Sequence, residues 1–347
     1  MTIARNRRAT GLVRTAALAL ALLAGAARPG LAQGATAGGV APERLVVYVS
    51  NEGSRTVDVV DAIAGRVLAT IPVGERPRGI HLSPDGRRLF VALSDEHPNV
   101  ESGRDAIAEI DVRTRRIVAR HRSGTDPEQF AITPDGRRLY AANEDAGTAS
   151  GVDLRTKRVL ATLIVGIEPE GVAVSPDGRW VYVTAETSNT VSVIDTRGDS
   201  VVANFLVDVR PRAVAFAPDG QRAYVTSEIS GTLTVVDARA HRVLASIPLG
   251  DERGKPVGVA VSPDGRRVYV ANGAAGTVSI VDPDAEREVG TIAVGRRPWG
   301  LALSRDGRWL VVANGLSHDI AVVDVREARV VRRIPVGRLP WGVAIGR

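Results

Sequence analysis

The sequence predicts an all-β protein, a seven-bladed β-propeller with four antiparallel strands per blade. Three observations lead to this fold class. A short turn motif recurs with a period in the forties, each repeat contains apolar runs of strand length, and the chain ends supply complementary parts of one repeat. A period of this length with strand-like content is typical of propeller blades rather than helical solenoids. We expect the propeller to extend over residues 44–347.

Six Asp-Gly turns mark the period, at spacings of 50, 42, 42, 45 and 42 residues. They are Asp85-Gly86, Asp135-Gly136, Asp177-Gly178, Asp219-Gly220, Asp264-Gly265 and Asp306-Gly307. In five of the six a preceding Pro presets φ, and in all six the Gly tolerates a positive φ, so each turn predicts a hairpin. One complete unit predicts four strands, at Gly171–Val174, Trp180–Thr184, Thr190–Ile194 and Val201–Leu206.

Two further positions repeat in every unit. An Asp ends each third strand, and seven equivalent carboxylates predict caps of the following turn rather than catalytic groups. They are Asp61, Asp111, Asp153, Asp195, Asp237, Asp282 and Asp324. A mostly aromatic position on the second strand predicts packing between blades. Its residues are Tyr48, Phe90, Tyr140, Tyr182, Tyr224, Tyr269 and Val311.

The chain ends predict how the ring closes. The first strand-like run, Leu45–Ser50, is the second strand of a repeat, whereas the last, Trp341–Ile345, is a first strand. We therefore expect the C-terminal strand to complete the N-terminal blade, which leaves no open sheet edge.

The N-terminus has the pattern of a secretory signal peptide. Four arginines up to Arg14 precede an apolar run at 15–27 and small residues ending at Ala32, which predicts cleavage near Ala32. The apolar run is too short to span a bilayer. Residues 33–43, rich in Gly and Ala, predict a flexible linker. We expect a mature protein in the periplasm or secreted, exported by the Sec route, with twin-arginine export as the alternative.

Composition excludes several classes of function. Five of the 45 basic residues and none of the 39 acidic ones lie in residues 1–32, so the mature chain carries 40 basic against 39 acidic residues. This balance argues against a nucleic-acid or anionic membrane partner. The absence of cysteine excludes disulfides, thiolate metal sites and covalent c-type haem.

Several segments resemble a known family. Tyr182-Val183-Thr184, Tyr224-Val225-Thr226 and Tyr269-Val270-Ala271-Asn272 resemble the YVTN family of β-propeller repeats over the whole mature chain. Other segments resemble the propeller proteins associated with PQQ-dependent alcohol catabolism: 75–79, 126–128, 143–145, 168–171, 227–229, 314–315 and 340–342. This resemblance implies an exported protein that works beside quinoprotein dehydrogenases and a transport system, either of which would supply its periplasmic protein partner.

The candidate site is the face that carries the turns after the second and fourth strands, which we call the top face. The residues after the repeated Pro are Trp341, Arg78, Glu128, Glu170, Arg212, Val257 and Trp299. A scaffold alone favours repetition, so a position that varies around the ring in this way indicates ligand recognition. Further candidates are Arg76, Arg210, Arg297, the aligned Glu52, Glu144, Glu186 and Glu228, and His97 in an insertion at 95–104.

Two interpretations of this face remain open. In one, Arg78 and Arg212 pair with neighbouring glutamates and the tryptophans fill the channel mouth. In the other, Trp299 and Trp341 stack on a planar group while the two arginines bind carboxylates, which suits PQQ or a peptide loop. The aligned glutamates offer oxygen ligands to a hard cation, but the spacing of a calcium loop is missing. We therefore expect no metal, and no cofactor apart from a contact with PQQ.

We find no sequence motif for a catalytic centre. The sequence therefore favours a monomeric, non-catalytic binding or accessory protein linked to PQQ-dependent alcohol oxidation and its transport system. One alternative is a lactonase, since seven-bladed propellers related to this repeat include 6-phosphogluconolactonase, although export argues against a cytoplasmic phosphosugar substrate. Another alternative is a cell-envelope or surface scaffold.

Overall fold

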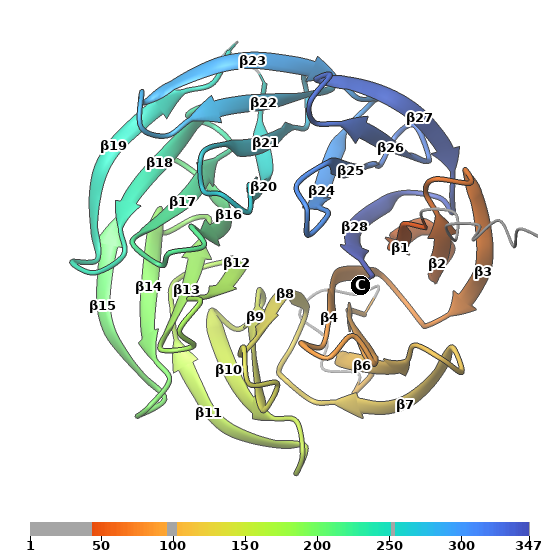
Figure 1. Cartoon of the computed structure of the whole chain (residues 1–347). Coiled ribbons are helices and arrows are strands. Elements are labelled where there is room, and N and C mark those ends of the chain that lie inside the picture. Colours follow the sequence, from red (N-terminus) through yellow and green to blue (C-terminus); the bar gives the residue numbers. More distant parts are fainter. Residues whose placement is uncertain (1–43, 96–102, 251–253, 347) are drawn as a thin grey trace, which may run out of the picture. The chain divides into compact units, whose positions relative to one another are not determined.

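The computed structural model describes residues 44–95, 103–250 and 254–346. These residues form seven four-stranded antiparallel sheets arranged around a central channel (Figure 1). The predicted seven-bladed propeller is therefore confirmed. The predicted signal peptide and linker, and also His97, lie outside the described residues.

We number the blades 1 to 7 from the N-terminus, each running from the channel outward. The inner strands are β28 (Pro340–Ile345), β4 (Pro77–Leu82), β8 (Pro127–Ile132), β12 (Pro169–Val174), β16 (Pro211–Phe216), β20 (Pro256–Val261) and β24 (Pro298–Leu303). The second strands are β1 (Val46–Asn51), β5 (Arg88–Leu93), β9 (Arg138–Asn143), β13 (Trp180–Ala185), β17 (Arg222–Ser227), β21 (Val268–Asn272) and β25 (Trp309–Asn314).

The third strands are β2 (Thr56–Asp61), β6 (Ala106–Asp111), β10 (Thr148–Asp153), β14 (Thr190–Asp195), β18 (Thr232–Asp237), β22 (Thr277–Asp282) and β26 (Asp319–Asp324). The outer strands are β3 (Arg66–Pro72), β7 (Arg116–His121), β11 (Arg158–Ile164), β15 (Ser200–Leu206), β19 (Arg242–Pro248), β23 (Arg287–Ala293) and β27 (Arg329–Pro335). A short 3-10 helix, η1 (Glu52–Ser54), follows β1. The predicted strands of blade 4 differ from these bounds by at most two residues.

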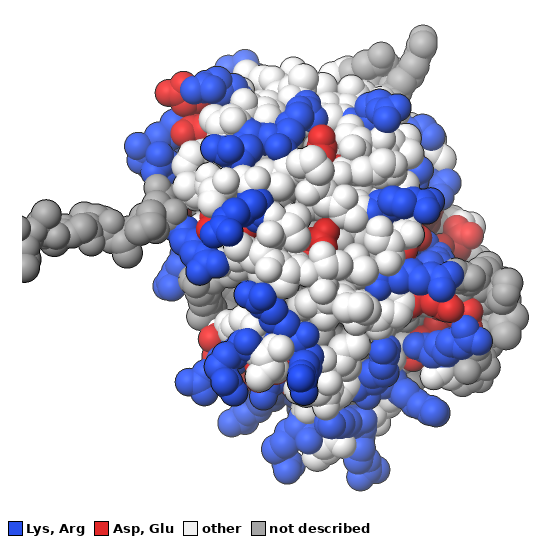
Figure 2. All heavy atoms as spheres, turned by 90° about the vertical axis from the view of Figure 1, so that its right-hand side faces the viewer, with Lys and Arg blue, Asp and Glu red and all other residues white. Residues whose placement is uncertain are grey.

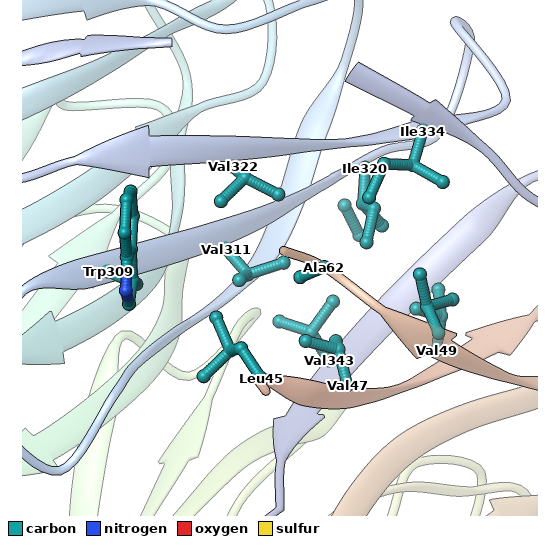
Figure 3. Packing of buried hydrophobic residues seen from close by; sticks show 12 residues of the cluster. Leu45, Val47, Val49, Ala62, Trp309, Val311, Ile320, Val322, Ile334 and Val343 are labelled. Carbon is teal, nitrogen blue, oxygen red and sulfur yellow. The ribbon is translucent and has the colours of Figure 1, made fainter. Parts of the chain in front are cut away.

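The ring closes as the sequence predicts. Strand β28 pairs with β1 in an antiparallel register that sets Val49 opposite Val343. Behind this pairing, apolar residues of blades 1 and 7 form one buried cluster, which includes Leu45, Val47 and Val311 (Figure 3). The N- and C-terminal strands are thus joined both by backbone hydrogen bonds and by a shared core.

The repeated residues have the predicted structural roles. Each of the seven aspartates accepts a hydrogen bond from a backbone N–H of the turn that follows its strand. The N–H of Ala64, for example, donates to Oδ1 of Asp61 at 2.9 Å. The position aligned with Tyr48 is buried between neighbouring blades all round the ring. Tyr182, for example, packs against Val214 and Val225 of the next blade. These repeated residues therefore maintain the scaffold.

Glycine at the third residue of five inner strands permits a close approach between blades. A Cβ atom on Gly258 would lie 2.2 Å from the carbonyl oxygen of Trp299, and one on Gly171 would lie 2.3 Å from that of Arg212. Both distances are too short for any side chain. Each of these inner strands is thereby held against the residue that follows the Pro in the next blade.

The outer surface carries mixed charge. On the side shown in Figure 2, Lys and Arg side chains are spread among uncharged residues, with acidic side chains in small groups between them. Within the described residues, no helix has the length and apolar character needed to cross a membrane.

Removal of β28 tests the closure. A chain ending at Leu339 loses the buried Trp341, Val343 and Ala344 and leaves an edge of β1 unpaired. We expect a loss of at least about 5 kcal/mol in the free energy of unfolding, comparable to the whole stability of many domains. Circular dichroism should show no cooperative thermal transition, and gel filtration should show aggregates. A control chain ending at Gly346 should melt like the full chain, and an unchanged melt of the shorter chain would contradict closure by β28.

Candidate functional site

A repeated backbone conformation builds the channel mouth on the top face. The residue before each inner-strand Pro has a positive φ, although none of the seven is glycine: Arg76, Asp126, Glu168, Arg210, Lys255, Arg297 and Leu339. In six blades its carbonyl accepts a hydrogen bond from the residue after the second strand, as Asp126 does from the N–H of Glu144 at 3.1 Å. A left-handed non-glycine residue costs about 1–2 kcal/mol. The surrounding hydrogen bonds hold it in place, so both residues of each pair keep a fixed position at the mouth.

The residues after the Pro form a second, deeper ring. Each is the second residue of its inner strand, in the order that the sequence predicts. Glu128 is 1% exposed, Glu170 5% and Arg212 9%. Burial of a charged group is tolerated only where an opposite charge compensates it. The arrangement of ion pairs therefore decides what this ring can do.

One group of ion pairs, the Glu144 cluster, comprises Glu52, Arg76, Arg78, Asp126, Glu128 and Glu144. Arg78 contacts Glu128, lies 3.4 Å from Glu52, and lies 3.8 Å from Glu144. Arg76 lies 3.2 Å from Asp126 and 3.7 Å from Glu52. Four carboxylates therefore share two guanidinium groups, which leaves an excess of negative charge.

Glu144 is the carboxylate of this cluster whose pKa is raised. Burial raises its pKa to about 7, and the nearby carboxylates of Glu170 and Asp126 act in the same direction, against Arg78 and Arg212. Its side chain remains 27% exposed, whereas those of Asp126 and Glu128 are 6% and 2% exposed. Glu144 is therefore accessible to a ligand and can exchange a proton near neutral pH.

The second group of ion pairs, the Arg212 cluster, comprises Glu170, Glu186, Arg210, Arg212, Glu228 and Lys255. Arg212 contacts Glu186 and lies 3.2 Å from Glu170. Arg210 lies 2.7 Å from Glu186 and 3.1 Å from Glu228. Lys255 lies 3.9 Å from Glu228, so three carboxylates face three cations. This cluster is balanced in charge, unlike the Glu144 cluster.

Two tryptophans form the apolar part of the mouth. The rings of Trp299 and Trp341 lie 5.9 Å apart at 44°, and the guanidinium groups of Arg212 and Arg297 lie 5.0 Å and 4.9 Å from the Trp299 ring. A hollow of about 170 Å³ is lined by both tryptophans, Arg297 and Arg78. A larger cleft of about 700 Å³ opens beside Trp299 on blades 6 and 7.

The structure thus brings most of the predicted residues together at one mouth. It places Arg78 and Arg212 in ion pairs with the chain's own glutamates, while Trp299 and Trp341 lie against each other. His81 lies in the channel below, 3.1 Å from Gln129, and burial lowers its pKa.

Some residues of this face were not predicted as site residues. Asp126, Lys255, Arg296 and Arg333 line the mouth or the cleft. Asp126 and Lys255 are charged residues directly before the repeated Pro, and this repeated position could have identified them in the sequence. Arg296 and Arg333 offered no such repeated pattern.

Three carboxylates of the mouth come close enough to share a cation. Oxygen atoms of Asp126, Glu128 and Glu144 lie within 4.8 Å of one another. Arg76 and Arg78 contact all three residues, so guanidinium groups already supply the compensating charge. We assign no metal to this group.

Comparison with known families identifies two partial matches. The family described as "Lactonase, 7-bladed beta-propeller" matches residues 203–331, and the family described as "Choice-of-anchor I domain" matches residues 40–206. The lactonase match includes Arg210, Arg212, Glu228 and Trp299 but not Glu144. No curated protein sequence matches the chain.

Solved structures of other propellers are similar in fold. Hydrazine synthase of Kuenenia stuttgartiensis superposes with a TM-score of 0.72 at 22% identity, covering 81% of this chain and 92% of that chain. A putative 6-phosphogluconolactonase from Bacteroides fragilis gives 0.74 at 16% identity, covering 88% and 99%. One from Bacteroides uniformis gives 0.74 at 19% identity, covering 87% and 99%. The chain is therefore a seven-bladed β-propeller with lactonase-like relatives in fold.

The raised pKa of Glu144 predicts a pH-dependent loss of stability. The unfolded carboxyl ionises near its ordinary pKa of 4.5, and the folded one near 7. The contribution of Glu144 to stability is therefore fully present below pH 4.5 and falls as the pH rises to about 7. Glu144→Gln should remove this fall and stabilise the protein at pH 8 by about 2 kcal/mol relative to wild type, allowing for solvent screening.

Urea unfolding of both proteins at pH 4.5 and pH 8 measures this difference. Glu144→Asp keeps a titratable group and should retain the fall. Equal pH dependence of wild type and Glu144→Gln would show that Glu144 ionises normally.

Arg212 should be the most costly charge to remove from the mouth. Arg212→Met leaves Glu170 and Glu186, which are 5% and 3% exposed, without this partner. We expect a loss of about 3–5 kcal/mol in the free energy of unfolding, with partial recovery when Glu186→Gln is added. Arg222→Met, which removes an exposed pair with Asp284, is the matched control and should cost less than about 1 kcal/mol. Similar losses for both arginines in urea unfolding would contradict this account.

Proposed function

We propose that the channel mouth is a lactonase-type site, in which Glu144 is the general base for hydrolysis of a cyclic ester. The carrying observation is the Glu144 carboxyl, which combines a partly exposed side chain with a pKa of about 7. A general base works best when its pKa lies near the operating pH. The other carboxylates of the Glu144 cluster have a buried position or, in the case of Glu52, lie between two arginines.

The reaction requires three events at this mouth. The Glu144 carboxylate takes a proton from water as the water oxygen attacks the lactone carbonyl carbon. The guanidinium of Arg78, 3.8 Å from Glu144, stabilises the oxyanion that forms. The ring C–O bond then breaks and Glu144 returns the proton to the leaving alkoxide. One water molecule is consumed, and the product is a hydroxy acid.

Fold and family similarity support the same reaction class. The lactonase family match spans 129 residues that contribute Arg212 and Trp299 to the mouth. Two similar structures are described as putative 6-phosphogluconolactonases. These similarities do not identify the lactone, and a propeller fold alone hosts many functions.

A binding role without turnover is the second candidate, and it includes the quinone-linked accessory role implied by the PQQ-associated resemblance. Five large apolar side chains are exposed at the top-face end of blades 3 to 5: Ile164, Ile167, Leu206, Val209 and Ile229. Exposed apolar groups of this kind favour contact with a protein partner. Unlike hydrolysis, binding without turnover does not require Glu144 to have a pKa near 7.

Lactone turnover distinguishes the two candidates. Purified protein is mixed with glucono-δ-lactone or dihydrocoumarin, and acid release is followed in a pH-stat above the spontaneous rate. We expect kcat/KM to rise with pH through an apparent pKa of about 7, because only ionised Glu144 accepts a proton. Glu144→Gln should lower kcat/KM on the order of 100-fold or more.

Glu327→Gln is the matched control, since Glu327 is exposed in the turn between β26 and β27, away from the mouth, and pairs with Arg329. It should leave kcat/KM unchanged. Two results would overturn the lactonase proposal: no turnover of either lactone by folded protein, or equal turnover by wild type and Glu144→Gln.

A further inference from the structure

The cleft beside Trp299 is lined by an excess of basic residues, unlike the rest of the mouth. It has a volume of about 700 Å³, within the range of small-molecule sites, and lies on the top face of blades 6 and 7. Its basic lining residues are Lys255, Arg296, Arg297 and Arg333. Glu228 is the one acidic residue among the described lining residues, and it already lies near Arg210, Arg212 and Lys255.

Within the described residues, no carboxylate neutralises two of these cations. Arg296 donates to the carbonyl of Leu316 at 2.7 Å, and Arg297 lies over the Trp299 ring. Neither forms an ion pair with a carboxylate in the described part of the chain, in contrast to Arg76 and Arg210, which each contact at least two. Adjacent unpaired guanidinium groups attract an oxyanion, to which each can donate two hydrogen bonds.

The wall next to these arginines is apolar. Trp299 is half-buried, Leu316 is 43% exposed, and Ala274 and Ala275 also line the cleft. An indole face next to a guanidinium pair suits a flat apolar group that carries an acid. A free inorganic ion would leave this apolar wall in contact with water.

We propose that this cleft binds a small organic oxyanion, with its carboxylate or phosphate on Arg296 and Arg297 and its flat apolar body on Trp299. The inference does not rest on the proposed hydrolysis, because binding requires no turnover. Arg297 and Trp299 also line the hollow of about 170 Å³ that includes Arg78. A ligand on Trp299 can therefore extend from the cleft toward the Glu144 cluster.

Calorimetric titration of the purified protein at low salt tests the proposal. The probes are 2-naphthoate, its neutral isostere 2-naphthamide, acetate and inorganic phosphate. We expect 2-naphthoate to bind more tightly than 2-naphthamide and acetate. The double variant Arg296→Ala, Arg297→Ala should lower the affinity for 2-naphthoate by at least about 10-fold, which corresponds to about 1.4 kcal/mol in binding free energy. Trp299→Ala should lower the affinity for 2-naphthoate but not the affinity for acetate.

The control double variant is Arg87→Ala, Arg266→Ala, which removes two exposed arginines from the Asp-Gly turns and should leave binding unchanged. Competition identifies the acid: displacement of 2-naphthoate by millimolar phosphate indicates a phosphate ligand, and displacement by acetate alone indicates a carboxylate ligand. Displacement by neither anion would overturn the proposal. So would absence of 2-naphthoate binding, or binding unaffected by the Arg296 and Arg297 substitutions, with thermal melts confirming that each variant is folded.

Discussion

The pairing of β28 with β1 is the constraint on which the rest of the structure depends. The sheet formed by these strands contains both ends of the described chain, and its core is shared with blade 7. Because every inner strand packs between two others, closure fixes the spacing of all seven strands around the channel. The mouth residues are therefore held at distances that local sequence does not determine.

Scaffold and site use different parts of the same repeat. Turn aspartates such as Asp61 and interblade aromatics such as Tyr182 recur because each blade has the same turn to cap and the same neighbour to pack against. At the top face, the left-handed residue before Pro and the close approach at Gly258 fix the backbone. Side chains there point toward the channel mouth rather than into a blade core, so they can differ without loss of the fold.

This division explains what the sequence could predict. Periodicity predicted the blades, the closure and the top face, because these follow from local patterns repeated seven times. Periodicity could not predict that Arg78 lies within ion-pair distance of three glutamates. These glutamates belong to blades 1 and 3 and come together only in the folded ring. The pKa of Glu144 depends on burial and on Glu170 of another blade, neither of which has a sequence pattern. Arg296 was missed because it is exposed and lies outside the repeated Pro motif.

The mouth carries opposite excesses of charge in two places. The Glu144 cluster has two more carboxylates than guanidinium groups, while the cleft holds Arg296 and Arg297 without carboxylate partners in the described chain. Trp299 and Trp341 line the hollow between these places. A ligand with an acid at one end is attracted to the cleft and repelled by the Glu144 cluster. In the proposed binding mode, the same charges disfavour the reversed orientation and direct the end of the ligand without the acid toward Glu144.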